Sequence, residues 1–339
     1  MKKVVDEVYE SLKTIPSSLK NNEKYVSENK IRDCIKKIYK QNNLYEDYYH
    51  KCHENRFILT LSEIPKCKNK DENILEIGSF TYFSMFLKEI LGYENVYGLD
   101  KISNTKEKIL KTTKKVGGKE YSQTIFNVDL DSEEDYETII KSGIKFDKII
   151  FMEVLEHLYR PTLPLIKFRK ILKEDGVLIL TTPNSCSLTS LYNLFNMKIP
   201  FTFSTMCYEN PYSMHVREYT PITLKYMLLS CGYSEKSFNT INAYNLEVKK
   251  EFYKLYPFKN KPELNKKLIN DTMISISTPN RNVISKTPDI LYQTAIYERA
   301  DIGTYMQTLD KYFNVKSLKD KNFFNFIKFI YLYFKTLRY

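Results

Sequence analysis

Short apolar runs alternate with charged segments of helical period across the middle of the chain. The runs have the length and β-branched content of buried strands, so we predict strands at residues 73–77, 95–99, 122–128, 146–152 and 176–182. The segments between them predict helices at residues 82–91, 105–115, 132–142 and 163–172. Strands that recur with intervening helices form parallel sheets with right-handed crossovers. The pattern therefore predicts a doubly wound, mainly parallel α/β sheet of the Rossmann-like class.

The segments on either side of this alternation have different patterns. Residues 1–72 show helical periodicity and are expected to form a helical N-terminal extension. We expect the α/β core to span residues 73–248, with an acceptor loop at 183–220 and a helix at 221–230. Residues 249–339 show no second alternating pattern, so we interpret them as a C-terminal appendage.

Polar residues and a glycine stand at the carboxyl ends of the predicted strands, where open α/β sheets bind ligands. The candidate ligand-binding positions at these ends are Glu76, Gly78, Ser79, Asp100, Asp129 and Glu153. Asp100 follows Gly78 by 22 residues, a spacing that suits a carboxylate accepting hydrogen bonds from two ribose hydroxyls. The strand ends therefore predict a ligand that contains a nucleoside.

The first of these turns, within ILEIGSFTYFSMFL at residues 74–87, lacks the glycines of a dinucleotide site. A pyrophosphate requires the pattern G-x-G-x-x-G, whereas this chain follows Gly78 with Phe80 and Tyr82. A sulfonium amino acid has no phosphate, so its binding does not need the two further glycines. The turn therefore disfavours a dinucleotide and is compatible with S-adenosylmethionine.

Several longer motifs carry a resemblance to a known family. The run NILEIG…VYGLD…FNVDLD…FDKIIFMEVLEHLYRP…ILKEDGVLILTTPN resembles the class I S-adenosylmethionine-dependent methyltransferases, in particular the type 11 group that includes ubiquinone-pathway O-methyltransferases. The later HVREYTPITLKYMLLSCGY resembles a subset found with bacterial surface-polysaccharide genes. The resemblance covers about residues 55–245. It implies a transferase that uses S-adenosyl-L-methionine, with a function in polysaccharide biosynthesis.

The resemblance also implies a role for each strand-end residue. Glu76, Gly78 and Ser79 are implied at the methionine end of the cofactor and Asp100 at the ribose, and Asp129 with Leu130 is implied at the adenine. Met152 and Glu153 are implied to close the pocket from below. The chain departs from the family at Phe80 and Tyr82, where small residues are usual. We expect these two rings to pack away under the following helix, leaving space for the cofactor.

Two groups of residues are candidates for catalysis. Glu153, Glu156 and His157 have the spacing i, i+3, i+4, which places side chains on one face of a helical turn. His157 is a candidate base for an acceptor hydroxyl, with a structural hydrogen bond as the alternative. In some ubiquinone-pathway relatives the matching positions are associated with a divalent metal, but we assign no metal ligand here. His215 is a second candidate base, and Arg217 is expected to pair with an anionic group of the acceptor.

Aromatic residues gather in and near the expected acceptor loop. They are Tyr192, Phe195, Phe201, Phe203 and Tyr208. Such rings stack on sugar faces, and the alternative is an ordinary hydrophobic cover for the sheet. The loop at 215–218 has a similar alternative, in which Glu218 and Tyr219 only hold it in place.

The overall composition is basic, with a formal net charge of +11 and a pI of about 9.0. The bases are interleaved with acids, so nucleic acid is an unfavoured partner and a small-molecule or glycan acceptor is expected. The aromatic, basic residues 322–339 suit a membrane interface, but packing on the body or a homodimer contact is the preferred alternative. The N-terminal residues do not read as a signal peptide, and the cysteines lack paired spacing, so we expect a cytoplasmic protein, with the inner membrane face as the alternative.

Three functions are compatible with these patterns. The leading hypothesis is O-methylation of a sugar in a surface glycan or its precursor, with His157, His215, Glu153 and Arg217 as catalytic residues. An RNA methyltransferase is the second, suggested by the net charge. The third is a scaffold protein that has lost cofactor binding, suggested only by Phe80 and Tyr82.

Overall fold

The computed structural model describes residues 2–19, 24–42, 47–79, 82–116, 118–200, 215–244 and 268–284. Several of the sequence predictions concern residues outside these ranges. They are the predictions for Phe80, Phe201, Phe203, Tyr208 and residues 322–339.

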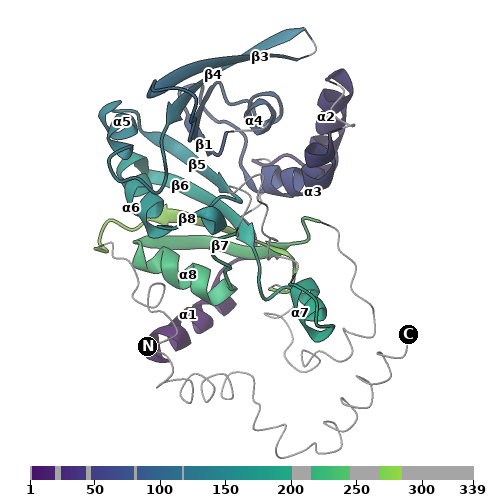
Figure 1. Cartoon of the computed structure of the whole chain (residues 1–339), viewed down its shortest axis with the longest axis vertical. Helices are drawn as coiled ribbons and strands as arrows, with labels where there is room; N and C mark the ends of the chain where they lie inside the picture. The colour runs from purple at the N-terminus through teal and green to yellow at the C-terminus, as the bar shows by residue number, and fades with distance from the viewer. Residues whose placement is uncertain are drawn as a thin grey trace, which may run out of the picture.

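A single eight-stranded sheet forms the centre of the molecule (Figure 1). Its strands are β1 (Asn73–Ile77), β2 (Asn95–Asp100), β3 (Ile109–Val116), β4 (Lys119–Asn127), β5 (Phe146–Met152), β6 (Leu172–Pro183), β7 (Tyr233–Ile241) and β8 (Thr272–Pro279). They lie in the order β3-β4-β2-β1-β5-β6-β8-β7. The five consecutive strands from β4 to β6 pair in parallel, whereas β3 and β8 pair with their neighbours in antiparallel fashion. The predicted Rossmann-like α/β fold is confirmed.

Helices cover both faces of the sheet (Figure 1). On one face lie α2 (Glu28–Gln41), α3 (Tyr48–Glu63) and α4 (Phe83–Leu91), and their apolar residues form one core with the sheet. On the other face lie α1 (Lys2–Thr14), α5 (Tyr136–Lys141), α6 (Thr162–Ile171) and α8 (Pro221–Ser230), which share a second core. The remaining helix, α7 (Leu188–Phe195), contributes Leu188, Leu191 and Tyr192 to a small separate cluster with Ile269. The predicted N-terminal helical region is therefore divided between the two faces.

The prediction of a helix at residues 105–115 is wrong. Residues 109–116 form β3 instead, which pairs with β4 from Ile109 opposite Phe126 to Val116 opposite Lys119. Gly118 has a φ of 81°, which allows the tight reversal between the two strands. The Asn127 side chain also ties the preceding loop to the sheet by donating to the carbonyls of Ile102 and Glu107. These tertiary contacts override the charged, helix-like composition of the segment.

The C-terminal region also differs from its prediction. The segment TMISISTP lies beyond residue 248 in the expected appendage, yet it forms β8 between β6 and β7. All its residues except Thr278 are buried. The strand is short and has no adjacent helix pattern to mark it, because residues 245–267 separate it from the alternating part of the sequence. The sheet therefore does not end at the predicted boundary.

No described helix is long and apolar enough to cross a membrane.

Candidate active site

The turn after β1 brings bare backbone to the carboxyl edge of the sheet. Gly78 has a φ of 70°, in the left-handed region, and its N–H donates to the Leu99 carbonyl at 2.8 Å. A Cβ at Gly78 would lie 3.0 Å from Val154 Cγ2. Only glycine combines this conformation with this close contact, so Gly78 leaves the edge open for a ligand.

Glu76 lies beneath this turn and not in the open edge. Its side chain is 1% exposed, and the carboxyl group accepts a hydrogen bond from the Ser84 N–H at the start of α4. Burial raises the pKa of Glu76 to about 8, although the Lys114 ammonium and the Gln123 amide oppose the shift. The structure thus shows Glu76 as a buried group that supports the turn, and its predicted contact with the cofactor stays a prediction.

A second glycine, Gly98 on β2, makes room for the side chains beside the turn. A Cβ at Gly98 would overlap Ser79 Oγ and would lie 2.9 Å from Gln123 Nε2. Ser79 Oγ is buried and lacks a hydrogen-bond partner within the described part of the chain. The structure therefore presents Ser79 as an unused polar group at the predicted cofactor edge.

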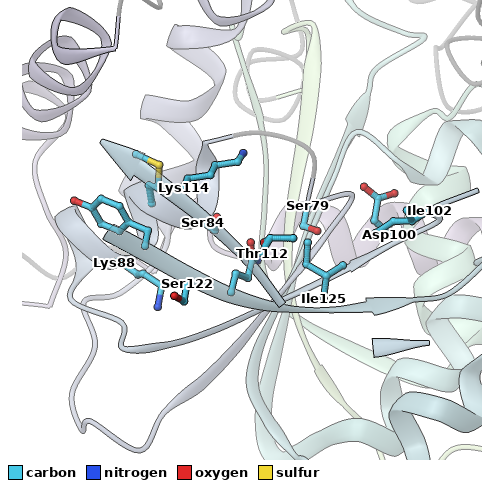
Figure 2. Close-up of a pocket in the computed structure, with 12 residues that line it drawn as sticks. Ser79, Ser84, Lys88, Asp100, Ile102, Thr112, Lys114, Ser122 and Ile125 are labelled. Carbon is cyan, nitrogen blue, oxygen red and sulfur yellow. The ribbon is translucent and has the colours of Figure 1, made fainter. Parts of the chain in front are cut away.

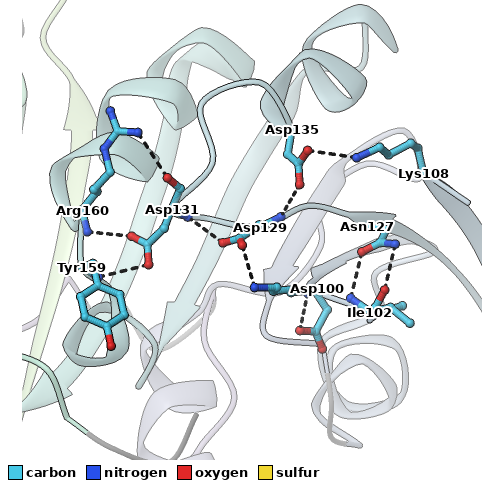
Figure 3. Close-up of polar contacts among 10 residues, drawn as sticks. Asp100, Ile102, Lys108, Asn127, Asp129, Asp131, Asp135, Tyr159 and Arg160 are labelled. Atoms are coloured by element: carbon cyan, nitrogen blue, oxygen red, sulfur yellow. Dashed lines mark hydrogen bonds and ion pairs between the residues drawn. The ribbon is translucent and has the colours of Figure 1, made fainter. Parts of the chain in front are cut away.

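Asp100 stands at the end of β2 on the same edge. Its carboxylate accepts a hydrogen bond from the Lys101 N–H at 2.7 Å, and burial raises the pKa of Asp100 above its usual value (Figure 3). The Lys101 N–H contacts Oδ1 of this carboxylate. Hydroxyl groups of a ligand suit a partly buried carboxylate, because each hydrogen bond that they donate compensates for the hydration the carboxylate has lost. This geometry is compatible with the ribose role predicted for Asp100.

Asp129 and its neighbours form a connected set of hydrogen bonds at the end of β4 (Figure 3). The Asp129 carboxylate accepts from the Asp131 N–H at 3.0 Å and pairs with Lys101 Nζ at 2.7 Å. Asp131 in turn accepts from the N–H groups of Tyr159 and Arg160 at 3.1 and 2.7 Å. Both acids are thus engaged in holding the loops, and an adenine amino group would have to compete with Lys101 for Asp129. Leu130 is buried next to this set and belongs to the core.

Glu153 departs from the predicted helical turn. The residue has a φ of 49°, and the helical turn after it is a short 3₁₀ helix, η2 (Leu155–His157). Its carboxylate faces α3, where Glu153 Oε2 lies 3.4 Å from Arg56 Nη1. Arg56 is buried and also donates to the hydroxyls of Tyr244 and Tyr49 at 3.2 and 3.3 Å. Glu153 therefore does not share one helix face with Glu156 and His157.

Met152, which precedes Glu153, is partly buried and packs against the core under α2, α3 and α4. This position is consistent with the predicted floor of the pocket. The ring of Tyr82 also packs on this side, with its centroid 5.1 Å from the His50 ring. Tyr82 thus contacts α3, although the prediction placed it under α4.

A second polar cluster forms where the loop before α8 meets η2. His215 Nδ1 lies 2.8 Å from Glu218 Oε1, and the His215 and His157 rings pack edge to face at 4.9 Å. Glu156 is fully buried beside them, and its Oε2 accepts from the Thr182 hydroxyl at 2.8 Å. Burial raises the pKa of Glu156 to about 8, with a further contribution from Glu153, while His215 opposes it.

The same cluster fixes the loop through the backbone. The Glu156 carbonyl accepts from the N–H groups of Val216 and Arg217 at 2.8 and 3.1 Å. Glu156, His157 and His215 also offer ligand atoms within 4.8 Å of one another, a spacing compatible with a metal ion. The structure therefore brings together the two predicted histidines, His157 and His215, which lie far apart in the sequence.

Sequence reasoning gave little weight to the residues that link these clusters. Arg56, Tyr244 and Thr182 are not among the candidate site residues of the sequence analysis. Thr182 had a usable signal, because it stands at the carboxyl end of β6. Tyr244 had none, since its contact with Arg56 joins residues 188 positions apart.

The edge as a whole fits a sulfonium nucleoside. Gly78 supplies an open backbone, Ser79 an unused hydroxyl and Asp100 a carboxylate acceptor. The turn after β1 lacks the two further glycines that a pyrophosphate cradle requires. A pocket of about 250 Å³ opens beside Ser79 and Asp100. The donor set on this edge is therefore chemically suited to S-adenosylmethionine.

Comparison with a protein-family model supports the same chemistry. Residues 46–234, more than half of the chain, match a family model described as a methyltransferase domain. The fold is similar to a SAM-dependent methyltransferase from Archaeoglobus fulgidus, with 19% identity, a TM-score of 0.36, and coverage of 74% of this chain and 94% of that chain. An S-adenosylmethionine-dependent methyltransferase from Mesorhizobium loti shows 12% identity, a TM-score of 0.36, and coverage of 62% and 93%. Phosphoethanolamine N-methyltransferase 2 of Haemonchus contortus, in complex with S-adenosyl-L-methionine, shows 10% identity, a TM-score of 0.37, and coverage of 76% and 60%. No curated protein matches the chain significantly.

Proposed function

The chain belongs to the methyltransferase family, and on that premise we propose that it methylates a hydroxyl oxygen of a sugar in a surface glycan or its precursor. The protein is an S-adenosylmethionine-dependent enzyme, and the bound cofactor supplies an electrophilic methyl group. A hydroxyl acceptor must lose its proton as its oxygen is methylated, so the protein has to provide a base near the acceptor.

The pairing of His215 with Glu218 is the observation that carries this proposal. With Nδ1–H of His215 donating to the Glu218 carboxylate at 2.8 Å, Nε2 is the basic nitrogen of the ring. The proton of the acceptor hydroxyl passes to this nitrogen, and the carboxylate stabilises the resulting imidazolium. Here His215 is the general base and Glu218 is the residue that orients it.

Glu156 has a different role in this arrangement. Because burial raises its pKa, the Glu156 carboxyl group holds its proton to a higher pH than an exposed glutamate does, so it interferes less with His215 as the base. Its carbonyl holds the 215–217 backbone against η2. Glu156 therefore positions the loop that carries the base.

Support for a sugar acceptor comes from the sequence. The segments TTPN at residues 181–184 and HVREYT at 215–220 carry the resemblance to the surface-polysaccharide subset of the type 11 group. The described end of α7 also exposes Leu194 and Phe195, with Met197 and Ile199 just beyond it. Apolar side chains of this kind can contact a sugar face or a lipid carrier, and a lipid-linked precursor would bring the enzyme to a membrane surface.

The test is an assay for release of S-adenosylhomocysteine across a panel of acceptors. The panel contains sugar nucleotides, lipid-linked sugars and an unmodified tRNA, each with and without a chelator. We expect release with a sugar acceptor, a loss in kcat of about a hundredfold or more in His215→Gln, and a smaller loss of about tenfold in Glu218→Gln. Cofactor affinity, measured by titration calorimetry, should be unchanged in both variants.

Other outcomes would select other functions. Release with tRNA alone would replace the sugar by RNA as the acceptor. Loss of activity in the chelator arm, restored by Mg²⁺, would assign the Glu156–His157–His215 cluster to a metal in place of a free base. Activity of His215→Gln equal to wild type would contradict the assignment of His215 as the base.

A further inference from the structure

The pocket beside Ser79 and Asp100 extends under the hairpin of β3 and β4. Its lining side chains come from the first turn, α4, the end of β2, β3 and β4. Figure 2 shows the labelled residues Asp100 and Ile102 at one end of this space and Lys114 and Lys88 towards the other. A crossover helix between β2 and β4 would cover this face of the sheet in an alternating α/β fold, but here a loop and then β3 join these strands. The pocket is thus a consequence of the hairpin.

The two ends of the pocket have opposite charge. Asp100 and the unused Ser79 hydroxyl stand at the first end, and Lys114 stands at the second. Among the described residues, no carboxylate lies within ion-pair distance of the Lys114 ammonium. Lys88, by contrast, donates to the Glu94 carbonyl at 2.6 Å. The Lys114 ammonium also acts on the buried Glu76 carboxyl group from beyond ion-pair distance, so Lys114 is a cation at this end of the pocket that can take an anionic ligand.

Tyr82 holds Lys114 in place. The Lys114 ammonium lies 4.7 Å from the centroid of the Tyr82 ring, and the same ring contacts His50 on α3, with the two ring centroids 5.1 Å apart. A cation over an aromatic face is stabilised by the ring quadrupole. This contact gives a role to Tyr82, the ring that departs from the small residues usual in the family, because it fixes a charged side chain next to the cofactor turn.

The cofactor has complementary chemical groups. Its ribose offers hydroxyl donors, and its amino-acid tail ends in a carboxylate. We propose that Lys114, presented by the β3–β4 hairpin, binds the carboxylate of S-adenosylmethionine while Asp100 binds the ribose. The inference rests on the cofactor of the family and not on the identity of the acceptor, so it deepens the proposed function without depending on the sugar.

Two ligands and three variants test this assignment by titration calorimetry. S-adenosylhomocysteine contains the carboxylate, and 5′-methylthioadenosine has the same nucleoside but no amino-acid tail. Lys114→Met should weaken binding of S-adenosylhomocysteine about tenfold, the usual effect of losing a hydrogen bond between charged groups. Binding of 5′-methylthioadenosine should stay unchanged. Lys114→Arg keeps the charge and should retain most of the affinity for S-adenosylhomocysteine.

Lys115→Met is the matched control. Lys115 is the next residue on β3, so its side chain points to the opposite face, where it lies 4.0 Å from Glu120. This variant should bind both ligands as the wild type does, and melting curves should show that all variants are folded.

Three results would overturn the inference. They are an equal loss for both ligands in Lys114→Met, no loss for either ligand, and a wild-type protein that binds the two ligands with equal affinity or binds neither. Failure of every acceptor in the methylation assay would leave this binding result intact, so the two proposals fail separately.

Discussion

Single residues at the carboxyl edge of β1 and β2 decide how closely side chains and a ligand can approach the backbone there. Gly78 provides the left-handed turn, and Gly98 provides the space into which Ser79 and Gln123 project. These two glycines act differently, because Gly78 is constrained by backbone conformation and Gly98 only by the space above it. A substitution at Gly98 therefore tests packing at the cofactor edge without strain in φ.

Gly98→Ala is expected to destabilise the protein by about 1–3 kcal/mol, the usual cost of adding a methyl group to a filled site. The new Cβ would displace Ser79, so affinity for S-adenosylhomocysteine should also fall. Urea denaturation and calorimetry measure the two effects. Gly143→Ala is the comparison, since a Cβ there has no neighbour within 4 Å and any cost arises from its φ of 71°. A loss of ligand affinity in Gly143→Ala equal to that in Gly98→Ala would contradict the steric explanation.

Whole elements bring distant parts of the sequence to the site. The α3 helix from the N-terminal region supplies Arg56, which reaches Glu153 at the end of β5 and Tyr244 after β7. The β3–β4 hairpin supplies Lys114 to the pocket. Both elements lie outside the strand–turn positions to which the family resemblance assigns cofactor roles.

Arg56→Met is expected to lower the free energy of unfolding by about 3 kcal/mol or more, because it leaves the Glu153 carboxylate buried without its partner. The side chains of Arg56 and Glu153 are only 5% and 9% exposed. Urea denaturation measures the loss, and the double variant with Glu153→Gln should recover part of it.

Arg32→Met provides the control for this prediction. Arg32 joins α2 to Glu54 of α3 at 3.7 Å, but its side chain is 39% exposed. Exposed pairs contribute about 0–1 kcal/mol, so this variant should be close to wild type. Similar losses in Arg32→Met and Arg56→Met would show that burial of the Arg56 pair is unimportant.

At the scale of the whole molecule, buried carboxyl groups make stability depend on pH. Burial raises the pKa of both Glu76 and Glu156 to about 8 from an ordinary value of 4.5, so the folded protein holds these protons over a range in which the unfolded chain releases them. These groups make their full contribution to the free energy of unfolding below about pH 4.5, and the contribution decreases as the pH rises towards 8.

Glu76→Gln should remove the contribution of this residue to the pH dependence. The difference in unfolding free energy between variant and wild type should shift in favour of the variant from pH 5 to pH 8, by at most about 1.4 kcal/mol per pH unit. Urea denaturation at several pH values gives this difference directly, and the other titrating groups cancel in it. A difference that stays constant over this range would mean that Glu76 is ionised in the folded protein.

The local pattern of the sequence was sufficient for much of the core. The strands at residues 73–77 and 146–152 and the helix at 221–230 were predicted with their observed bounds, because short apolar runs and a Thr-Pro helix start depend on neighbouring residues. The same kind of reasoning failed for residues 105–115 and 272–279. Both segments become strands through pairing with partners that no local pattern indicates.

By itself, the sequence determined which polar residues stand at the strand ends and that the first turn lacks the glycines of a pyrophosphate cradle, since these follow from residue types at fixed offsets from buried strands. The cofactor class came from the resemblance of the motifs to class I methyltransferases. Only the tertiary structure decided that Glu76 supports the turn from below, that Glu153 faces Arg56, and that His157 meets His215. It also decided that Lys114 reaches the pocket beside ILEIGSFTYFSMFL. The physical reason is that burial and pairing depend on which distant segments pack together, and those contacts join residues far apart in the chain.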